Sequence, residues 1–283
     1  MKPGPFAYHS PTSVEQTVAT LGELGHDGKV LAGGQSLIPI LSMRLAKPAH
    51  LVDINRVVGL DQIEVTEQHI RVGATVRHSA LERDGAAYAA IPLLRQALEC
   101  VAHPAIRNRG TTVGSIAHAD AAGEMPAVAA LTEAVMEVVG PRGRREVAAG
   151  DFFEGALETV LDAEELLEAV RFGRFPEGTR TAFIESARRQ GDYALAGVAV
   201  ALTVIDGVLD RVRASYVSVT DVPGVLELTE ALRGQEPAGA DWSAVDDLVQ
   251  AHIAPEADIH ATADYRRMLA GELTRRALTE AAR

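Results

Sequence analysis

Residues 106–124 have the sequence IRNRGTTVGSIAHADAAGE, and the interpretation of the rest of the chain starts from this stretch. It is rich in Gly, Ala, Thr and Ser, and two glycines, Gly110 and Gly114, bracket a Thr-Thr-Val run. Small residues let a backbone approach a ligand closely, and consecutive backbone N–H groups in a turn form a concave anion site. Threonine and serine hydroxyls add further donors. The stretch therefore predicts a loop that holds phosphate groups.

A second stretch of the same character, LAGGQSL, occupies residues 31–37. It follows a short apolar run at residues 29–31, which predicts a strand, and it leads into a predicted helix over residues 36–45. The N-terminus of that helix would point at whatever the loop holds, which favours an anion. One glycine-rich loop is weak evidence because most are plain turns. Two such loops, each beside an apolar run, indicate a ligand with two phosphates.

Composition excludes several classes of protein. The 283 residues carry a net charge of −12, which argues against a nucleic-acid binder because a phosphate-binding face needs a basic stripe. The single cysteine, Cys100, cannot form an intrachain disulfide, an iron–sulfur cluster or a thiolate zinc site. His118 and Asp120 lack a matched third ligand, so no metal site is predicted. Without an apolar leader or a run of membrane-spanning length, a cytoplasmic protein is expected.

The order of apolar segments and turns predicts an α+β protein in two domains. The first covers residues 1–175, with a small unit at about 1–55 and a second, mostly antiparallel unit at about 56–175. The helix after residue 13 is expected to begin with a capping box in which Thr12 is the N-cap and Glu15 reaches back. The second domain, residues 176–283, is predicted to contain three strands, at 181–187, 196–205 and 208–219, and then helices from about residue 224.

Four strings carry a resemblance to a known family. They are AGGQSLIPILSMRLAKPAHLVDI (32–54), HPAIRNRGTTVGSIAHADAAGEMPA (103–127), DFFEG (151–155) and ARRQGDYALAGVAVAL (187–202). Together, and in this order, they resemble the FAD-carrying medium subunit of molybdenum hydroxylases. The resemblance implies a two-part FAD-binding domain of the vanillyl-alcohol-oxidase-like (PCMH) type. A C-terminal three-stranded antiparallel sheet with helices would follow it.

The resemblance also implies a role for particular positions. The first pyrophosphate loop would be formed by Ala32, Gly33, Gly34, Gln35 and Ser36, and the second by Thr111, Thr112, Val113, Gly114 and Ser115. Glu124 matches a carboxylate near the FAD ribose. Asp192 and Tyr193 match a loop whose aromatic ring can cover the flavin. One of Leu166 and Leu167 would contact the adenine or the flavin.

Three positions depart from the family pattern. Val113 replaces the first glycine of a usual pair, so either the loop is less tight or the family does not need a positive φ there. Ala121 stands where a proline is usual. Glu185 stands near the place where many members carry a lysine, which puts in doubt an ion pair with the flavin or a neighbouring subunit.

The function implied by the resemblance is electron transfer. The substrate would be hydroxylated at a molybdopterin cofactor on a large subunit, and electrons would pass through [2Fe–2S] clusters on a small subunit to FAD on this chain. FAD would release them to an external acceptor, in an assembly expected to be a dimer of heterotrimers. No catalytic residue is expected here, because the cofactor carries the chemistry. Carbon monoxide, a purine, an N-heterocycle and an aldehyde all remain open as substrates.

Two alternatives remain. One is a stand-alone flavin oxidase or reductase of the same fold, which would need a proton donor or base over the flavin, and Tyr193 is the only nearby candidate. The other is an assembly subunit without flavin, for which Val113 and Ala121 are the only indications.

Overall fold

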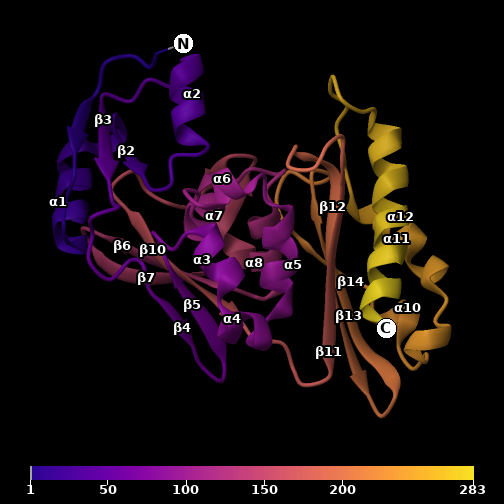
Figure 1. The fold of residues 1–283 in the computed structure, drawn as a ribbon. Coiled ribbons are helices and arrows are strands. Elements are labelled where there is room, and N and C mark those ends of the chain that lie inside the picture. Colours follow the sequence, from indigo (N-terminus) through magenta and orange to yellow (C-terminus); the bar gives the residue numbers. More distant parts are fainter. Residues whose placement is uncertain (1) are drawn as a thin grey trace.

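A computed structural model describes residues 2–283 (Figure 1). The N-terminal unit contains a parallel sheet in the order β1-β3-β2, with bounds β1 (Ala7–His9), β2 (Gly28–Leu31) and β3 (His50–Asp53). Helix α1 (Val14–Leu24) and a 3-10 turn (Gly25–Asp27) connect the first two strands, and α2 (Leu37–Met43) precedes the third. The predicted cap of α1 is wrong by one residue. Ser13 is the N-cap and accepts a hydrogen bond from the backbone N–H of Gln16, because the Thr12 hydroxyl is bonded to the Gln16 side chain instead.

The second unit is built on a five-stranded antiparallel sheet in the order β4-β5-β10-β6-β7. Its strands are β4 (Ile63–Val65), β5 (His69–Gly73), β6 (Val135–Gly140), β7 (Gly143–Ala148) and β10 (Leu166–Gly173). The predicted antiparallel pairing of this unit is confirmed. A separate small hairpin joins β8 (Phe153–Gly155) to β9 (Glu158–Thr159).

Short helices fill the middle of the molecule, between the five-stranded sheet and the C-terminal sheet (Figure 1). They are α3 (His78–Arg83), α4 (Gly85–Ala90), α5 (Pro92–Cys100), α6 (Pro104–Arg107), α7 (Thr112–His118), α8 (Glu124–Leu131) and α9 (Ala149–Phe152). Helix α8 is buried over nearly its whole surface, because α5 and α7 flank it and two strands of the C-terminal sheet pack against it.

The C-terminal sheet is antiparallel and has four strands, not the three that were predicted. They are β11 (Thr179–Ala187), β12 (Ala194–Ile205), β13 (Val208–Val217) and β14 (Val225–Glu227). The start of the predicted helix near residue 224 forms β14, which pairs with Arg213–Ser215. A three-residue segment is too short to show a strand period, so its pairing partner decides its conformation.

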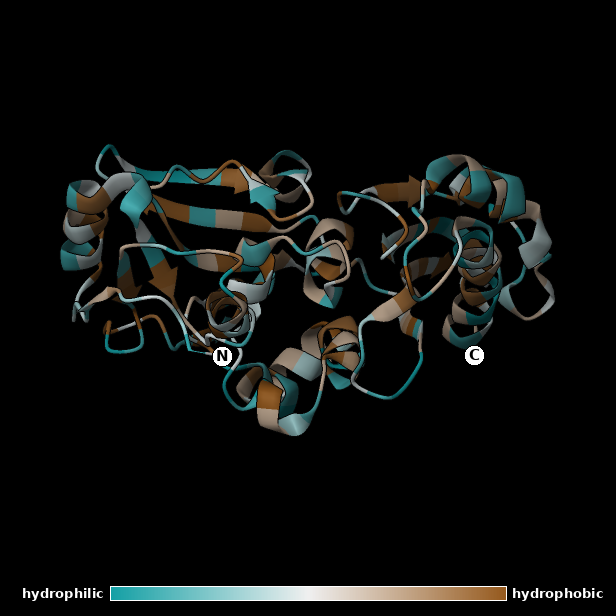
Figure 2. Ribbon diagram, turned by 90° about the horizontal axis from the view of Figure 1, so that it is seen from above, coloured by the Kyte–Doolittle hydropathy of each residue, from teal (hydrophilic) through white to brown (hydrophobic). Residues whose placement is uncertain are grey.

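The remaining helices cover the outer face of this sheet (Figure 1). They are α10 (Thr229–Leu232), 3-10 turns at Pro237–Gly239 and Trp242–Val245, α11 (Asp246–His252) and α12 (Ala263–Ala281). In Figure 2 the apolar, brown residues concentrate on the strands, whereas hydrophilic residues are frequent on the outermost helices. No helix within residues 2–283 is long and apolar enough to cross a membrane.

Strand β12 belongs to two hydrophobic cores. Its side chains alternate: Ala199 and Ala201 face the core shared with the helices in the middle, while Val198 and Val200 face the core under α12. Successive side chains of a strand point to opposite faces of the sheet. A strand that is buried on both faces therefore needs an almost continuous apolar sequence, which is what ALAGVAVALTVI supplies.

Candidate functional site

The two glycine-rich stretches meet in space. A Cβ atom built on Gly33 would lie 2.5 Å from the backbone oxygen of Arg109 and 2.7 Å from the Cα of Gly110. A Cβ built on Gly114 would lie 3.7 Å from the Cβ of Ala32. Gly33 therefore has no room for a side chain at this contact, and a Cβ built on Gly110 would lie 2.9 Å from the His78 ring. The two predicted loops therefore form one site.

The first loop presents unused donors. Within residues 2–283, the backbone N–H groups of Gly33, Gly34, Gln35 and Ser36 have no hydrogen-bond acceptor. Gly34 has a φ of +72°, a conformation that an L side chain adopts only with strain. The Gln35 side chain bonds the carbonyl oxygen of Gly33 at 3.0 Å, which holds the turn. These N–H groups are free to bind an anion.

The second predicted loop is in fact the beginning of helix α7. Thr111 is its N-cap and accepts a hydrogen bond from the backbone N–H of Gly114 at 3.2 Å. Val113 lies in the first turn of α7 and is 1% exposed. It is not among the residues with positive φ, so this position needs no glycine. The sequence suggested a loop because Thr, Val and Gly are all poor helix formers.

The hydroxyl groups of this segment are already engaged. Thr112 is fully buried, and its Oγ1 lies 3.1 Å from Nδ1 of His78. Burial, with a contribution from Arg107, lowers the pKa of His78 to about 4, so the imidazole is neutral at pH 7. Ser115, one turn further along, is only partly buried. The backbone N–H groups of Thr112 and Ser115 donate to the oxygens of Val76 and Thr111, so of the N–H groups of residues 111–115 only those of Thr111 and Val113 have no acceptor within residues 2–283.

An arginine that the sequence did not single out joins the two segments. Nη2 of Arg77 donates to Oδ1 of Asn55 at 2.6 Å, and Nη1 of Arg77 donates to the backbone oxygen of Arg109. Nδ2 of Asn55 in turn donates to the backbone oxygen of Ala32 at 2.8 Å. Asp53 at the end of β3 accepts from the Asn55 backbone at 2.9 Å and fixes its position. These hydrogen bonds, from Arg77 to Arg109 and Asn55 and from Asn55 to Ala32, fix the position of the two segments relative to each other.

Carboxylates gather beside the second segment. Burial raises the pKa of Glu124 to about 7, and nearby Asp120 acts in the same direction. Tyr193 is 67% exposed, yet partial burial and the charges of Asp120 and Glu124 raise its pKa. The Tyr193 ring therefore lies in the field of these two carboxylates. The predicted ribose residue and the predicted flavin-covering residue are brought to the same region.

Glu185 belongs to this acidic region too. Its Oε2 is buried and has no hydrogen-bond partner within residues 2–283. Burial and Glu124 raise the pKa of Glu185 to about 8, and burial together with Glu185 and Glu124 raises that of Cys100 to about 12. Glu185 forms no ion pair within residues 2–283, so no cation offsets the cost of burying its charge.

The other predicted residues lie further from this geometry. Leu166 and Leu167 are 3% and 4% exposed in β10 and belong to the main core. Consecutive strand residues point to opposite faces, so at most one of them can face a ligand. Asp192 forms no ion pair with Arg188 or Arg189 in the described chain. Its backbone N–H donates to the oxygen of Arg189 at 3.1 Å and closes the turn before Tyr193.

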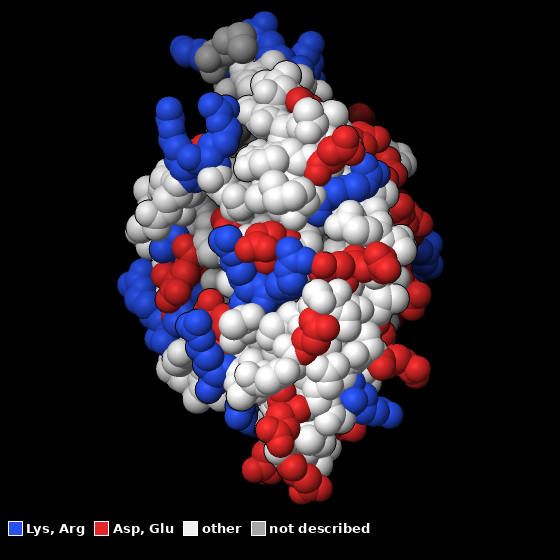
Figure 3. All heavy atoms as spheres, turned by 90° about the vertical axis from the view of Figure 1, so that its right-hand side faces the viewer, with Lys and Arg blue, Asp and Glu red and all other residues white. Residues whose placement is uncertain are grey.

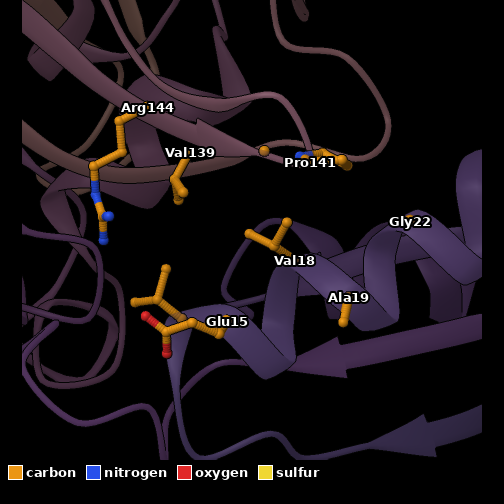
Figure 4. A pocket seen from close by; sticks show the side chains of 9 residues that line it. Glu15, Val18, Ala19, Gly22, Val139, Pro141 and Arg144 are labelled. Carbon is orange, nitrogen blue, oxygen red and sulfur yellow. The ribbon is translucent and has the colours of Figure 1, made fainter.

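A surface groove of about 370 Å³ lies elsewhere, between α1 and the β6–β7 turn. Val18, Ala19, Val139 and Pro141 give it an apolar lining, and Glu15 and Arg144 lie at one end (Figure 4). It contains none of the predicted site residues. Over residues 2–283 no group of three or more His, Cys, Asp or Glu side chains is arranged for a metal ion.

Sequence reasoning missed Asn55, Arg77 and His78. Asn55 and Arg77 act through side-chain bonds to loop carbonyls, and such bonds leave no periodic signal. The only available signal was position, because Asn55 directly follows the strand HLVDI. Polar residues that follow a strand end are frequent at sites of this kind.

The comparisons with known proteins cover nearly the whole chain. Residues 4–174 match the family described as FAD binding domain in molybdopterin dehydrogenase. Residues 181–281 match the family described as CO dehydrogenase flavoprotein C-terminal domain.

Similar proteins have the same length and fold. The nicotine 6-hydroxylase medium subunit of Paenarthrobacter nicotinovorans is 38% identical, over 99% of both chains. The carbon monoxide dehydrogenase medium chain of Hydrogenophaga pseudoflava is 36% identical, over 99% of this chain and 98% of that one. A chain of the reconstituted CO dehydrogenase from Oligotropha carboxidovorans superposes with a TM-score of 0.95 at 37% identity, covering 100% of this chain and 99% of that one.

Proposed function

The chain belongs to the family of FAD-binding medium subunits of molybdenum hydroxylases, and from this premise we propose that it transfers electrons from [2Fe–2S] clusters of a partner subunit, through FAD, to an external acceptor. The observation that carries the proposal is the contact of Gly33 with the backbone of Arg109 and Gly110. This contact brings the unused N–H groups of residues 33–36 close to those of Thr111 and Val113, which have no acceptor within residues 2–283. A diphosphate is the ligand that such a pair of cradles fits.

The residues present fit FAD. The unused N–H groups of residues 33–36 supply donors for one phosphate. At the start of α7 the N–H groups of Thr111 and Val113, which have no acceptor within residues 2–283, supply donors for the other. We assign the first group of contacts to Ala32, Gly33, Gly34, Gln35 and Ser36, and the second to Thr111, Thr112, Val113, Gly114 and Ser115. Since the hydroxyls of Thr111 and Thr112 and the backbone N–H of Thr112 are engaged, the backbone N–H groups of Thr111 and Val113 would make the hydrogen bonds of the second group.

The rest of the cofactor would extend from this cradle toward the acidic region. Glu124 would accept a hydrogen bond from the ribose, and Tyr193, held by the turn at Asp192, would cover the flavin ring. One of Leu166 and Leu167 would contact the adenine or the flavin. When bound, FAD accepts electrons one at a time and can release them as a pair. The chain binds and orients it.

Further features of the assembly belong to the same proposal. The FAD-binding domain would be of the vanillyl-alcohol-oxidase-like (PCMH) type and span residues 1–175, in units of about 1–55 and 56–175, with the C-terminal domain at 176–283. The partners would be an iron–sulfur small subunit and a molybdopterin large subunit in a cytoplasmic dimer of heterotrimers. Similarity to medium chains of molybdenum hydroxylases over the full length supports this proposal.

The visible absorbance spectrum of the purified chain tests the cofactor. We expect the spectrum of an oxidised flavin, and FAD as the chromophore released on denaturation. Isolated chain that turned over a substrate by itself would instead favour a stand-alone flavin enzyme. A colourless chain that takes up no added FAD, either alone or co-expressed with its partner subunits, would favour a flavin-free assembly subunit.

A further inference from the structure

Helix α2 is apolar but has almost no partner. Six of its seven residues in LIPILSM are apolar, yet only Leu41 is buried. Figure 1 shows α2 at the upper end of the molecule, clear of the central helices, and it makes no extensive contact with another helix or strand of residues 2–283. An apolar helix that stays exposed is typical of an interaction site.

The most exposed apolar side chains lie at the far end of this helix. Met43 is 51% exposed and Leu45, two residues further on, is 74% exposed. With a rise of about 1.5 Å per residue, Met43 lies about 10 Å along the helix from Ser36, where the proposed pyrophosphate loop ends. Met43 and Leu45 therefore lie at the end of α2 that is remote from the proposed pyrophosphate loop. We call Met43 and Leu45, with the cations described next, the α2 face.

The charge around α2 is the opposite of the charge of the whole chain. Residues 28–52 contain Lys29, Arg44 and Lys47 and no acidic residue, whereas the whole chain has 39 acidic and 27 basic residues. Nε of Arg44 donates to the backbone oxygen of Lys2 at 3.4 Å, which brings a further cation to the same end. None of these four cations forms a salt bridge within residues 2–283. Figure 3 shows basic side chains gathered at the upper end of the molecule, where α2 stands in Figure 1.

We infer that the α2 face is the docking surface for the iron–sulfur subunit. This inference rests on the proposed function. An electron donor must come close to the FAD site, and α2 begins directly after the first FAD loop, so a partner seated on α2 would adjoin the side of the site that this loop forms. The unpaired cations around exposed Met43 and Leu45 would be complemented by a partner surface with carboxylates around an apolar centre.

The test is assembly of the co-expressed complex. Two variants are compared with the wild type: Met43→Glu with Leu45→Glu, and Arg44→Glu with Lys47→Glu. The matched control is Ile259→Glu with Met268→Glu, since these side chains are 94% and 54% exposed in the C-terminal domain. For each variant, affinity for the iron–sulfur subunit is measured by interferometry at low and high salt. FAD content of the chain alone and its mass in solution are recorded in parallel.

We expect the Met43/Leu45 variant to bind the iron–sulfur subunit about 100-fold more weakly, with FAD content and melting temperature unchanged. The Arg44/Lys47 variant should lose affinity at low salt and show a reduced salt dependence. The control should bind like wild type. Binding of both variants within threefold of wild type would overturn the inference. So would loss of the large subunit alone, or conversion of a wild-type dimer of this chain into a monomer with partner binding intact.

Failure of the proposed function gives a different result. In that case the wild-type chain has no FAD and binds no iron–sulfur subunit, and the control variant behaves in the same way. Wild-type chain that contains FAD and binds the partner, with unaffected Met43/Leu45 and Arg44/Lys47 variants, rejects the docking surface alone.

Discussion

Gly33 lies against Gly110 so closely that a Cβ on Gly33 would fall 2.7 Å from the Cα of Gly110. The two residues are far apart in the sequence: Gly33 lies just after β2, and Gly110 lies between α6 and α7. The contact requires an α-carbon without a side chain at Gly33, and it sets how closely the first glycine-rich loop approaches the segment before α7. We therefore expect a substitution at this contact to reduce FAD binding while the chain still folds.

Gly33→Ala should remove most of the FAD. The added methyl group would lie 2.5 Å from the Arg109 backbone oxygen, so the first loop must move away from α7. Overpacking of this kind costs about 1–3 kcal/mol of stability. The flavin absorbance per chain measures the effect, with circular dichroism to verify folding. Gly150→Ala is the matched control, because nothing lies within 4 Å of a Cβ there. A folded Gly33→Ala chain with full FAD content would contradict the assignment.

Arg77→Gln should weaken FAD binding without unfolding the chain. The variant loses the bonds to Asn55 and to the Arg109 carbonyl, so the two segments are no longer held in register. We expect about a tenfold higher dissociation constant for FAD, equivalent to about 1.4 kcal/mol, from titration of the apoprotein. Arg83→Gln is the control, since Arg83 makes a 3.3 Å bond to the Asn108 side chain at the neighbouring surface. Equal affinities of the two variants would show that the Arg77 bridge does not position the loops.

The apoprotein should become less stable as pH rises from about 7 to 9, a range above the ordinary pKa of histidine, where buried His78 is neutral in both states. Burial raises the pKa of Glu124 to about 7 and that of Glu185 to about 8, so the folded chain holds protons that the unfolded chain releases above its ordinary pKa. Stability is therefore fully present below that ordinary value and is lost as pH rises through the raised one. A tenfold change in the affinity of a carboxylate for its proton corresponds to about 1.4 kcal/mol, so a loss on the order of 2 kcal/mol is expected in urea unfolding.

Glu185→Gln should flatten this pH dependence and stabilise the chain at pH 8, because a neutral amide has no charge to bury. Glu177→Gln, at an exposed position, is the matched control and should retain the wild-type slope. An unchanged slope in Glu185→Gln would mean that Glu185 ionises as freely as an exposed carboxyl group.

Cys100 should react slowly with a disulfide reagent while the chain is folded. Burial, Glu185 and Glu124 raise its pKa to about 12, so almost no thiolate is present at pH 8. As the only cysteine of the chain, it gives a single labelling rate. We expect a rate at least about 100-fold below that in guanidinium chloride. Comparable rates in the two conditions would show that the thiol is ionised and accessible.

Much of the fold follows from local sequence signals. The strand ALAGVAVALTVI is too apolar to have an exposed face, and the antiparallel pairing predicted for residues 56–175 includes the two strands that Gly140 and Gly143 join. The glycine loops were recognisable because unusual backbone geometry requires glycine, as at Gly34. These signals are contained in neighbouring residues, so one sequence suffices to find them.

The features that escaped prediction depend on distant partners. Val225–Glu227 is a strand only because Arg213–Ser215 lies beside it. The helix at Thr112–His118 begins with residues of low helical propensity, and burial of Val113 and Ile116 compensates for this. The bridge from Arg77 to Asn55 joins residues from separate elements, and no local pattern indicates it. Such contacts become visible only when the chain is folded.

Strand β12 contributes alternate side chains to both cores, so the stability of each core depends on the other. If the C-terminal helices detached, Val198 and Val200 would be exposed to water. The resulting loss of order in β12 would also disturb the packing of Ala199 and Ala201 on its other face. The C-terminal helices, which pack on the outer face of β12, thus help to stabilise the first core on its inner face. Cutting the chain between its two units would remove Ala199 and Ala201 from the first core and expose that face of the C-terminal sheet, so heat should melt the intact chain in a single cooperative step.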